Sequence, residues 1–229
     1  MNSVKATTLK LVSLVAVLFL IFTLFSGVIC IKTYEVSKKY IVVIDAGHGG
    51  IDVGTSGVNT GVKESDINLI IAKKMQEKFV KLNVLTVMTR ADNEGLYGDT
   101  QPGFKKRDLQ KRLEIINTSN ADLAVSIHQN EYISKSRRGA QAFFKKGNEK
   151  GENLAKIIQS HLNGMRLSPR ILSHLSGDYF LLNESNIPTA IVECGFLSSP
   201  EDEALLLTDS YQNDLADAIV LACLQFLSV

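Results

Sequence analysis

Two histidines occupy matching places in this sequence. His48 follows the apolar run Ile41–Ile44 in the segment Asp-Ala-Gly-His-Gly-Gly, and His128 directly follows the run Leu123–Ile127. Such runs are typical of buried strands, and glycine lets the backbone come close to a ligand. We expect both imidazoles at the same edge of a sheet, where they could bind one metal ion. The alternative, for a histidine at a strand end, is a hydrogen-bonded surface residue.

Two carboxylates add to this pair. Glu64 stands just before a helical pattern, and Glu193 closes the apolar segment Thr189–Glu193. Two imidazoles and one carboxylate are the ligands of hydrolytic zinc centres, in which water takes the fourth position and its pKa falls towards about 7. A carboxylate nearby that is not a ligand acts as general base and then as acid. The candidates are His48, Glu64 and His128 for Zn²⁺ and Glu193 for catalysis, although Glu64 could simply favour a helix N-terminus.

Other polar residues have weaker patterns. Asp45 could bind the metal, but we favour a role in orienting His48 or a loop amide from outside the ligand set. His161 lies on a helical face and is expected to be solvated, whereas His174 lies in a loop and could touch substrate. A basic cluster is expected to be a solvated loop and strand edge, with contact to an anionic polymer as the alternative; it comprises Lys135, Arg137, Arg138, Lys145 and Lys146.

The elements that position these residues alternate along the chain. Strands and helices of this size predict an α/β class: a single domain with a mostly parallel central sheet flanked by helices. Ligands bind such sheets outside the carboxyl ends of the strands. Strands are expected at Ile41–Ile44, Val84–Met88, Leu123–Ile127, Gly139–Phe144, Tyr179–Leu182 and Thr189–Glu193, and helices at Ile67–Leu82, Leu109–Ile116, Glu152–Leu162 and, as one segment or a pair, Pro200–Phe226. Loops are expected at 91–104 and 164–176.

The N-terminus predicts a membrane anchor. Residues 11–31 carry no charge, and about 20 such residues span a bilayer as a helix, whereas the apolar core of a signal peptide has about 7–15. We therefore expect a cytoplasmic N-terminus over 1–10, a transmembrane signal-anchor over 11–31, a tether over 32–39 and a catalytic domain over 40–229. A cleaved signal peptide is the alternative. Lysines on both sides leave the orientation open.

Composition narrows the classes of function. The formal net charge is +1 and 21% of residues are charged, so no strong field would recruit nucleic acid. The 45% of hydrophobic residues excludes a wholly disordered chain. Three cysteines show no metal-finger or CxxC spacing. Cys194 fits a small buried strand residue better than a nucleophile.

With these residues in place, the chain resembles the zinc-dependent N-acetylmuramoyl-L-alanine amidases of the type 3 family from about Tyr40 to Phe226. It departs from the family pattern at Gln129 and Cys194, neither of which is a candidate ligand. The motifs that carry the resemblance are Ile44-Asp45-Ala46-Gly47-His48-Gly49-Gly50, Lys63-Glu64-Ser65, Thr89-Arg90, Arg112 to Asn117, Ala121 to Asn130 and Pro188 to Ser198.

The resemblance implies that His48, Glu64 and His128 bind Zn²⁺ and that Glu193 is the catalytic acid/base. It implies hydrolysis of the amide between the lactyl group of N-acetylmuramic acid and L-alanine in peptidoglycan, at an extracytoplasmic site. Asn130, Arg90 and Arg112 match the family at positions that we take as structural or behind the ligands.

An anchored catalytic domain without wall-binding repeats is most similar to the spore-cortex, germination-specific amidases of endospore formers. That similarity implies a forespore location, a downstream deacetylase that leads to muramic-δ-lactam, and room for an accessory activating protein. Two alternatives stay open from sequence: a zinc peptidase that acts on the stem peptide, and an inactive wall-binding regulator.

Overall fold

The computed structural model describes residues 15, 17 and 39–228. The chain divides into two units, Met1–Lys38 and Lys39–Val229, and every strand and helix below belongs to the second. The predicted cytoplasmic segment, signal-anchor and tether lie outside the described residues, apart from positions 15, 17 and 39. Within the part of the chain that the structure describes, no helix has the length and apolar character to cross a membrane.

A six-stranded sheet forms the centre of the second unit. Its strand order is β2-β1-β3-β6-β4-β5, and all neighbours are parallel except β4 and β6, which are antiparallel. The α/β class is therefore confirmed, and the sheet is mixed. The strands are β1 (Ile41–Ala46), β2 (Leu85–Met88), β3 (Leu123–Asn130), β4 (Gln141–Phe144), β5 (Leu175–Ser176) and β6 (Thr189–Phe196).

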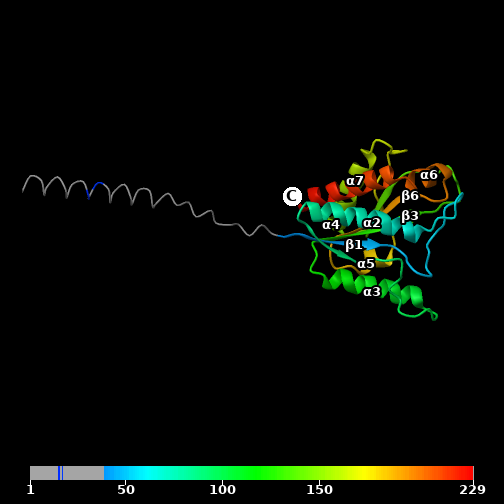
Figure 1. Cartoon of the computed structure of the whole chain (residues 1–229), viewed down its shortest axis with the longest axis horizontal. Helices are drawn as coiled ribbons and strands as arrows, with labels where there is room; N and C mark the ends of the chain where they lie inside the picture. Colours follow the sequence, from blue (N-terminus) through cyan, green and yellow to red (C-terminus); the bar gives the residue numbers. More distant parts are fainter. Residues whose placement is uncertain (1–14, 16, 18–38, 229) are drawn as a thin grey trace, which may run out of the picture. The chain divides into compact units, whose positions relative to one another are not determined.

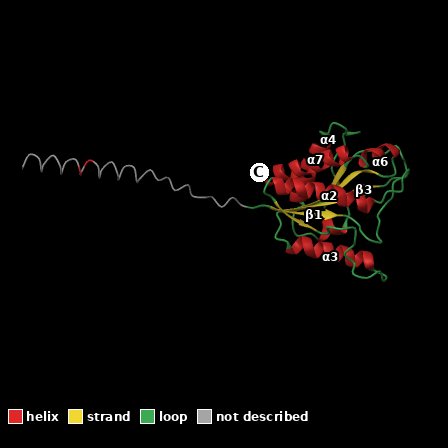
Figure 2. Ribbon diagram, viewed as in Figure 1, coloured by secondary structure: helices red, strands yellow, loops and turns green. Residues whose placement is uncertain are grey.

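Helices cover both faces of this sheet (Figures 1 and 2). One face carries α2 (Glu64–Lys81), α4 (Glu149–Asn163) and α7 (Asp209–Leu227), and the larger apolar core lies beneath them. The other face carries α3 (Phe104–Thr118) and the short α5 (Phe180–Glu184) over a smaller cluster. The helix α6 (Pro200–Leu206) follows β6, so the predicted C-terminal helical region is a pair. Apolar side chains on both faces explain the continuous apolar runs of the central strands.

Three expectations about elements were wrong. Residues 180–182 begin α5, with Tyr179 as its N-cap, rather than forming a strand, because a short apolar run has no periodicity that separates a strand from a helix. The region 164–176, expected to be a loop, contains β5. Strands β3 and β6 also continue past His128 and Glu193, which face each other in register inside the ladder.

Candidate metal centre and catalytic cleft

Four predicted residues come together at the carboxyl edge of the sheet. His48 follows β1, His128 lies in β3, Glu193 lies in β6, and Glu64 is the first residue of α2. All four line one cleft of about 460 Å³. The rest of its lining is Gly54, Thr55, Lys105, Gln129, Asn130, Glu131 and Tyr179. The convergence expected from the sequence is thus present in the structure.

His48, Glu64 and His128 have the spacing of a metal-binding set. One ligand atom from each lies within 4.8 Å of the other two. Glu64 Oε1 is 3.3 Å from His48 Nε2 and 3.0 Å from His128 Nδ1, and the two imidazoles meet edge to face with centroids 4.9 Å apart. Three donors of these types on one side of an open cleft fit a zinc ion that keeps a position for substrate or water.

The backbone around His48 is held in an uncommon conformation. The φ angle of His48 is 60°, in the left-handed region, which costs a non-glycine residue energy. Arg112 Nη2 donates a hydrogen bond to His48 O at 2.6 Å, which helps to fix this turn. At Gly47, an added Cβ would meet the His128 ring at 2.3 Å, so only glycine lets β1 end this close to the second histidine.

Asp45 and the two predicted arginines form a buried network behind the ligands. Asp45 accepts hydrogen bonds from Ser126 and Thr89 and pairs with Arg112 Nη1 at 2.7 Å. It makes no hydrogen bond to the His48 imidazole, and its link to His48 runs through Arg112, which donates both to Asp45 and to the His48 carbonyl. The expected role of Asp45 outside the ligand set, in orienting His48 or a loop amide, stays a prediction. Burial opposes ionisation, but Arg112 and the two hydroxyls outweigh it and lower the pKa of Asp45 to about 2.

Arg90 belongs to the same network. Its guanidinium donates to the backbone carbonyls of Ala46, Gly47 and Ser65 at 2.8–3.0 Å. It therefore ties the end of β1 to the start of α2, which carries Glu64. These contacts agree with the expectation that Arg90 lies behind the ligands.

Asp52 orients His48 and was not found from the sequence. Its Oδ2 lies 2.9 Å from His48 Nδ1, and its Oδ1 pairs with Lys105 Nζ at 2.9 Å. A carboxylate on the far nitrogen of a ligating histidine fixes the ring and its tautomer. Asp52 lies in the loop between β1 and α2, where no periodicity marks a functional side chain; its spacing from His48 was the only signal.

The charged groups of the cluster shift one another's pKa values. Burial by itself would lower the pKa of His48, but the carboxylates of Asp52 and Glu64 raise it to about 9. Burial likewise opposes the ionised form of Glu64, yet His128 and His48 hold its pKa far below the usual range. A metal ion has to displace protons from both imidazoles, so its affinity should fall at acidic pH.

Glu193 has the environment of a general acid/base. It is 7% exposed, and its Oε2 is buried without a hydrogen-bond partner. Burial is the main reason that its pKa rises to about 7, and the charge of Glu64 adds to this, although His128 acts in the opposite direction. An orphaned buried oxygen is costly unless something in the cleft binds it. A carboxyl group that titrates near neutrality can both take up and release a proton.

Tyr179 lies in the cleft beside Glu193 and was also not expected there. Its ring packs against Phe143 at 5.6 Å in an edge-to-face arrangement. Burial, and then the charge of Glu193, raise the pKa of Tyr179 to about 12. The hydroxyl therefore stays protonated and can donate a hydrogen bond. Asn130 lines the same cleft, as expected for a residue near the site.

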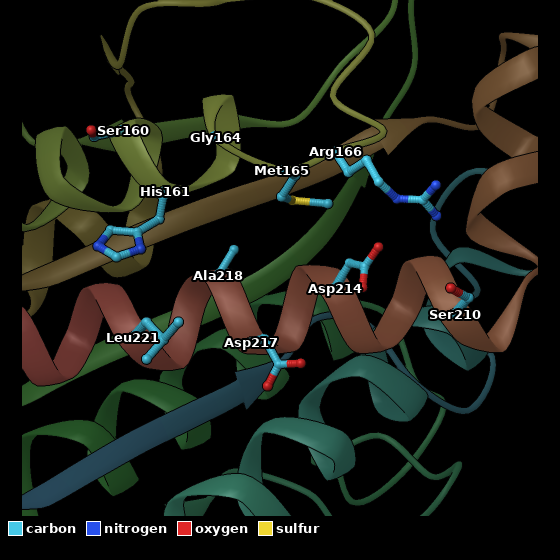
Figure 3. A pocket seen from close by; sticks show the side chains of 10 residues that line it. All are labelled: Ser160, His161, Gly164, Met165, Arg166, Ser210, Asp214, Asp217, Ala218 and Leu221. Carbon is cyan, nitrogen blue, oxygen red and sulfur yellow. The ribbon is translucent and has the colours of Figure 1, made fainter.

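The remaining sequence candidates lie elsewhere. His161 is half-buried and hydrogen-bonds Gln225 of α7, so it lies between α4 and α7 rather than on a freely solvated face. His174 packs near Phe144 rather than lining the cleft. Cys194 is fully buried, and burial raises the pKa of its thiol, which argues against a nucleophile. A separate cavity of about 510 Å³ between the C-terminal end of α4 and α7 holds none of the four converging residues (Figure 3).

Comparison with known proteins gives a consistent picture. The family model described as N-acetylmuramoyl-L-alanine amidase matches residues 42–225. The germination-specific N-acetylmuramoyl-L-alanine amidase of Bacillus subtilis is 33% identical over 190 residues, which are 81% of this chain and 79% of that protein.

Solved structures of amidases share the fold, among them those of CwlD and CwlV. The CwlD amidase from Clostridioides difficile, solved in complex with the GerS lipoprotein, has a TM-score of 0.77 and 35% identity and covers 83% of this chain and 99% of that chain. The catalytic domain of CwlV from Bacillus (Paenibacillus) polymyxa has a TM-score of 0.73 and 26% identity and covers 83% of this chain and 99% of that chain.

Proposed function

Because this chain belongs to the N-acetylmuramoyl-L-alanine amidase family, we propose that its His48–Glu64–His128 cluster binds Zn²⁺ and that Glu193 is the acid/base of a peptidoglycan amidase. The bond to be cleaved joins the lactyl group of N-acetylmuramic acid to L-alanine. The observation that carries the proposal is the buried, unpartnered oxygen of Glu193 in a cleft shared with the three candidate ligands.

The residues of the cleft divide the chemistry between them. Zinc, when bound by the three ligands, polarises the amide carbonyl and acidifies water. Glu193 accepts a proton from the water whose oxygen attacks the carbonyl carbon. It then delivers that proton to the L-alanine nitrogen as the carbon–nitrogen bond breaks, which leaves a lactyl carboxylate and a free amine. Tyr179 donates a hydrogen bond to the substrate while this happens.

The substitution Glu193→Gln tests this assignment. We expect hydrolysis to fall by about 10²–10⁴-fold, the contribution of a positioned acid/base, with bound zinc unchanged. Glu131→Gln is the matched control, since Glu131 lines the same cleft but is exposed, and it should keep activity within a few-fold. By contrast, His48→Ala and His128→Ala should lose zinc by elemental analysis. Full hydrolysis by Glu193→Gln would overturn the assignment.

Analysis of the digestion products separates the amidase from a stem-peptide peptidase. Purified peptidoglycan is digested with and without added Zn²⁺. An amidase should release free lactyl groups and peptides with a new L-alanine N-terminus, and added Zn²⁺ should support this release. Shortened stem peptides still attached to muramic acid would instead support the peptidase. Binding to the wall without any product would support an inactive regulator.

The biological role that we propose is maturation of the spore cortex. Its support is the similarity to a germination-specific amidase of Bacillus subtilis and to CwlD. In this role the enzyme acts outside the cytoplasm, anchored by residues 11–31, and a deacetylase then processes the stripped muramic acid towards muramic-δ-lactam. Spores that lack the protein should contain no muramic-δ-lactam, and wild type but not Glu193→Gln should restore it.

We further propose that an accessory protein assists the enzyme. The support is that CwlD was solved with the lipoprotein GerS, and that the candidate zinc-binding group among the described residues has three side chains. Zinc retention measured with and without a co-purified lipoprotein partner tests this point. Equal retention in both samples would argue against it.

A further inference from the structure

A second cleft, lined by arginines, lies next to the catalytic one. It has a volume of about 310 Å³ and is lined by Tyr132, Ser134, Ser136, Arg137, Arg138, Arg170 and Leu172. We refer to it as the arginine cleft. Three guanidinium groups in one small cleft favour an anionic ligand.

Only one of these guanidiniums is neutralised. Arg138 Nε pairs with Asp202 Oδ1 at 3.0 Å, while Asp202 Oδ2 accepts from the amides of Gly139 and Phe196. Both oxygens of that carboxylate are therefore occupied. Among the described residues, Arg137 and Arg170 have no carboxylate within ion-pair distance.

Arg137 is held in place by aromatic rings rather than by a charge. Its guanidinium lies 4.5 Å from the Tyr132 ring centroid and 5.7 Å from that of Phe196. Stacking on the face of a ring leaves the edge of the guanidinium, with its N–H donors, free for a planar anion. A carboxylate fits this fork, because it can accept two parallel hydrogen bonds.

The two clefts are neighbours along two elements. Glu131 lines the catalytic cleft and the next residue, Tyr132, lines the arginine cleft. Strand β6 carries Glu193 at the first cleft and, three residues later, Phe196 beneath Arg137. The ladder bulges here, so that these three residues of β6 face only two residues of β3, His128 and Asn130, and span about 7 Å. An extended peptide covers the same distance in about two residues.

From this arrangement we propose that the arginine cleft binds a free carboxylate of the peptidoglycan stem peptide, two to three residues from the scissile amide. The proposal rests on the proposed amidase function, since it places the peptide leaving group on the side of Arg137 and Arg170. It makes the enzyme selective for stem peptides with free rather than amidated carboxylates.

The test is steady-state hydrolysis by the purified full chain of two soluble muropeptides that differ only in amidation of the stem carboxylates. The variant is Arg137→Gln/Arg170→Gln. The matched control is Arg166→Gln, because Arg166 lines the separate cavity between α4 and α7 (Figure 3). Unchanged unfolding midpoints establish that the variants are folded.

On the free-carboxylate substrate, KM of the double variant should rise about 10-fold with kcat within two-fold, as two partly exposed ion pairs would give. On the amidated substrate, wild type and variant should have the same raised KM, and Arg166→Gln should match wild type on both. Equal loss on both substrates, or no loss, overturns the proposal.

Two further outcomes are distinguishable. Weaker retention on walls that carry phosphate polymers, with KM for the soluble muropeptides unchanged, would assign the cleft to a wall polyanion and overturn the proposal. Failure of wild type to cleave the lactyl amide would refute the proposed function instead. In that case, calorimetry with the free-carboxylate muropeptide still decides the proposal: affinity lowered by the double variant supports it, and unchanged affinity refutes it.

Discussion

Replacing Arg112 by methionine should destabilise the fold and loosen the metal centre together. Arg112 is 1% exposed. It pairs with Asp45 at 2.7 Å and with Asp108, and it donates to the carbonyls of Ala46 and His48, both at 2.6 Å. Methionine fills a similar volume but supplies none of these donors. The substitution therefore leaves two buried carboxylates, Asp45 and Asp108, without the Arg112 cation and one left-handed turn without its hydrogen bond.

The expected loss of unfolding free energy is about 3–5 kcal/mol at pH 7, the range for removing one partner of a buried ion pair. Asp45 is the main source, because it is 1% exposed and keeps only the hydroxyls of Ser126 and Thr89. Asp108 is 6% exposed, so its carboxylate also loses a buried partner. The double variant Asp45→Asn/Arg112→Met should lose less than the sum of the two single variants, because the second change removes the stranded charge.

The loss should shrink as the pH falls. In wild type the pKa of Asp45 is lowered to about 2, so its contribution is present above the unfolded value near 3.8 and is lost only as the pH falls towards 2. In Arg112→Met the Arg112 charge, which is the largest cause that lowers the pKa of Asp45, is gone, and burial then raises that pKa above its value in the unfolded chain. Protonation of Asp45 at mildly acidic pH therefore removes the buried charge from the variant, while Asp45 of the wild type is still ionised. The difference at pH 4 should therefore be smaller than at pH 7.

Chemical denaturation followed by circular dichroism at pH 4 and pH 7 measures the loss of unfolding free energy and its dependence on pH. Competition with a chelator measures the zinc affinity and so reports on the metal centre. Lys111→Met is the matched control, since Lys111 is on the same helix and forms an exposed pair with Glu114. Such a pair is worth about 1 kcal/mol at most. A loss below about 1 kcal/mol for Arg112→Met, or the same loss at pH 4 and pH 7, would refute the reasoning.

Three other predictions concern the cleft itself. Gly54→Ala should weaken zinc binding by at least about 10-fold in chelator competition, because Gly54 has a φ of 70° and an added Cβ would lie 2.3 Å from Glu64 Oε2; unchanged affinity would contradict this. Asp52→Asn should lower zinc affinity by about 10–100-fold through the lost His48 Nδ1 partner, and an unchanged affinity would show that the pair has no such role. Tyr179→Phe should lower kcat by about 10–100-fold without moving the pH profile between 5 and 9, since the pKa of its hydroxyl is raised to about 12; a shifted alkaline limb in that range would show that the hydroxyl titrates there and would contradict this prediction.

The convergence of the four candidate residues could be predicted because it follows from topology. Parallel strands present their carboxyl ends at one edge of a sheet, so His48, His128 and Glu193 had to lie near each other once their runs were assigned as neighbouring strands. Glu64 follows from its place at the start of α2, directly above that edge. Neither argument depends on side-chain detail, which explains why pattern and chain order sufficed.

What could not be predicted lies in loops and in short elements. Asp52 lies in a loop without hydrophobic periodicity, and Lys105 lies in the first turn of α3, ahead of the helix start predicted at Leu109. Their ion pair joins positions 53 residues apart. Tyr179 was placed in a strand, because the five-residue α5 is too short for a helical pattern to show. The left-handed turn at His48 was not predicted either, since a positive φ is uncommon for any non-glycine residue, although histidine adopts it more often than most. These features determine how the ligands are oriented, while the sheet determines only that they meet.

The buried network lies behind His48 because this histidine, unlike His128 and Glu193, is not positioned by the sheet. His128 and Glu193 are held in register by the ladder between β3 and β6. His48 stands past the end of β1, in a backbone conformation that costs energy and that no ladder enforces. Arg112, on the opposite face from α2, supplies that constraint through the His48 carbonyl, and Asp52 supplies it at the imidazole. His48, on a loop, is thus held by charged groups where His128, on a strand, is held by the ladder, and under the proposed zinc binding this would tie metal affinity to the stability of the fold.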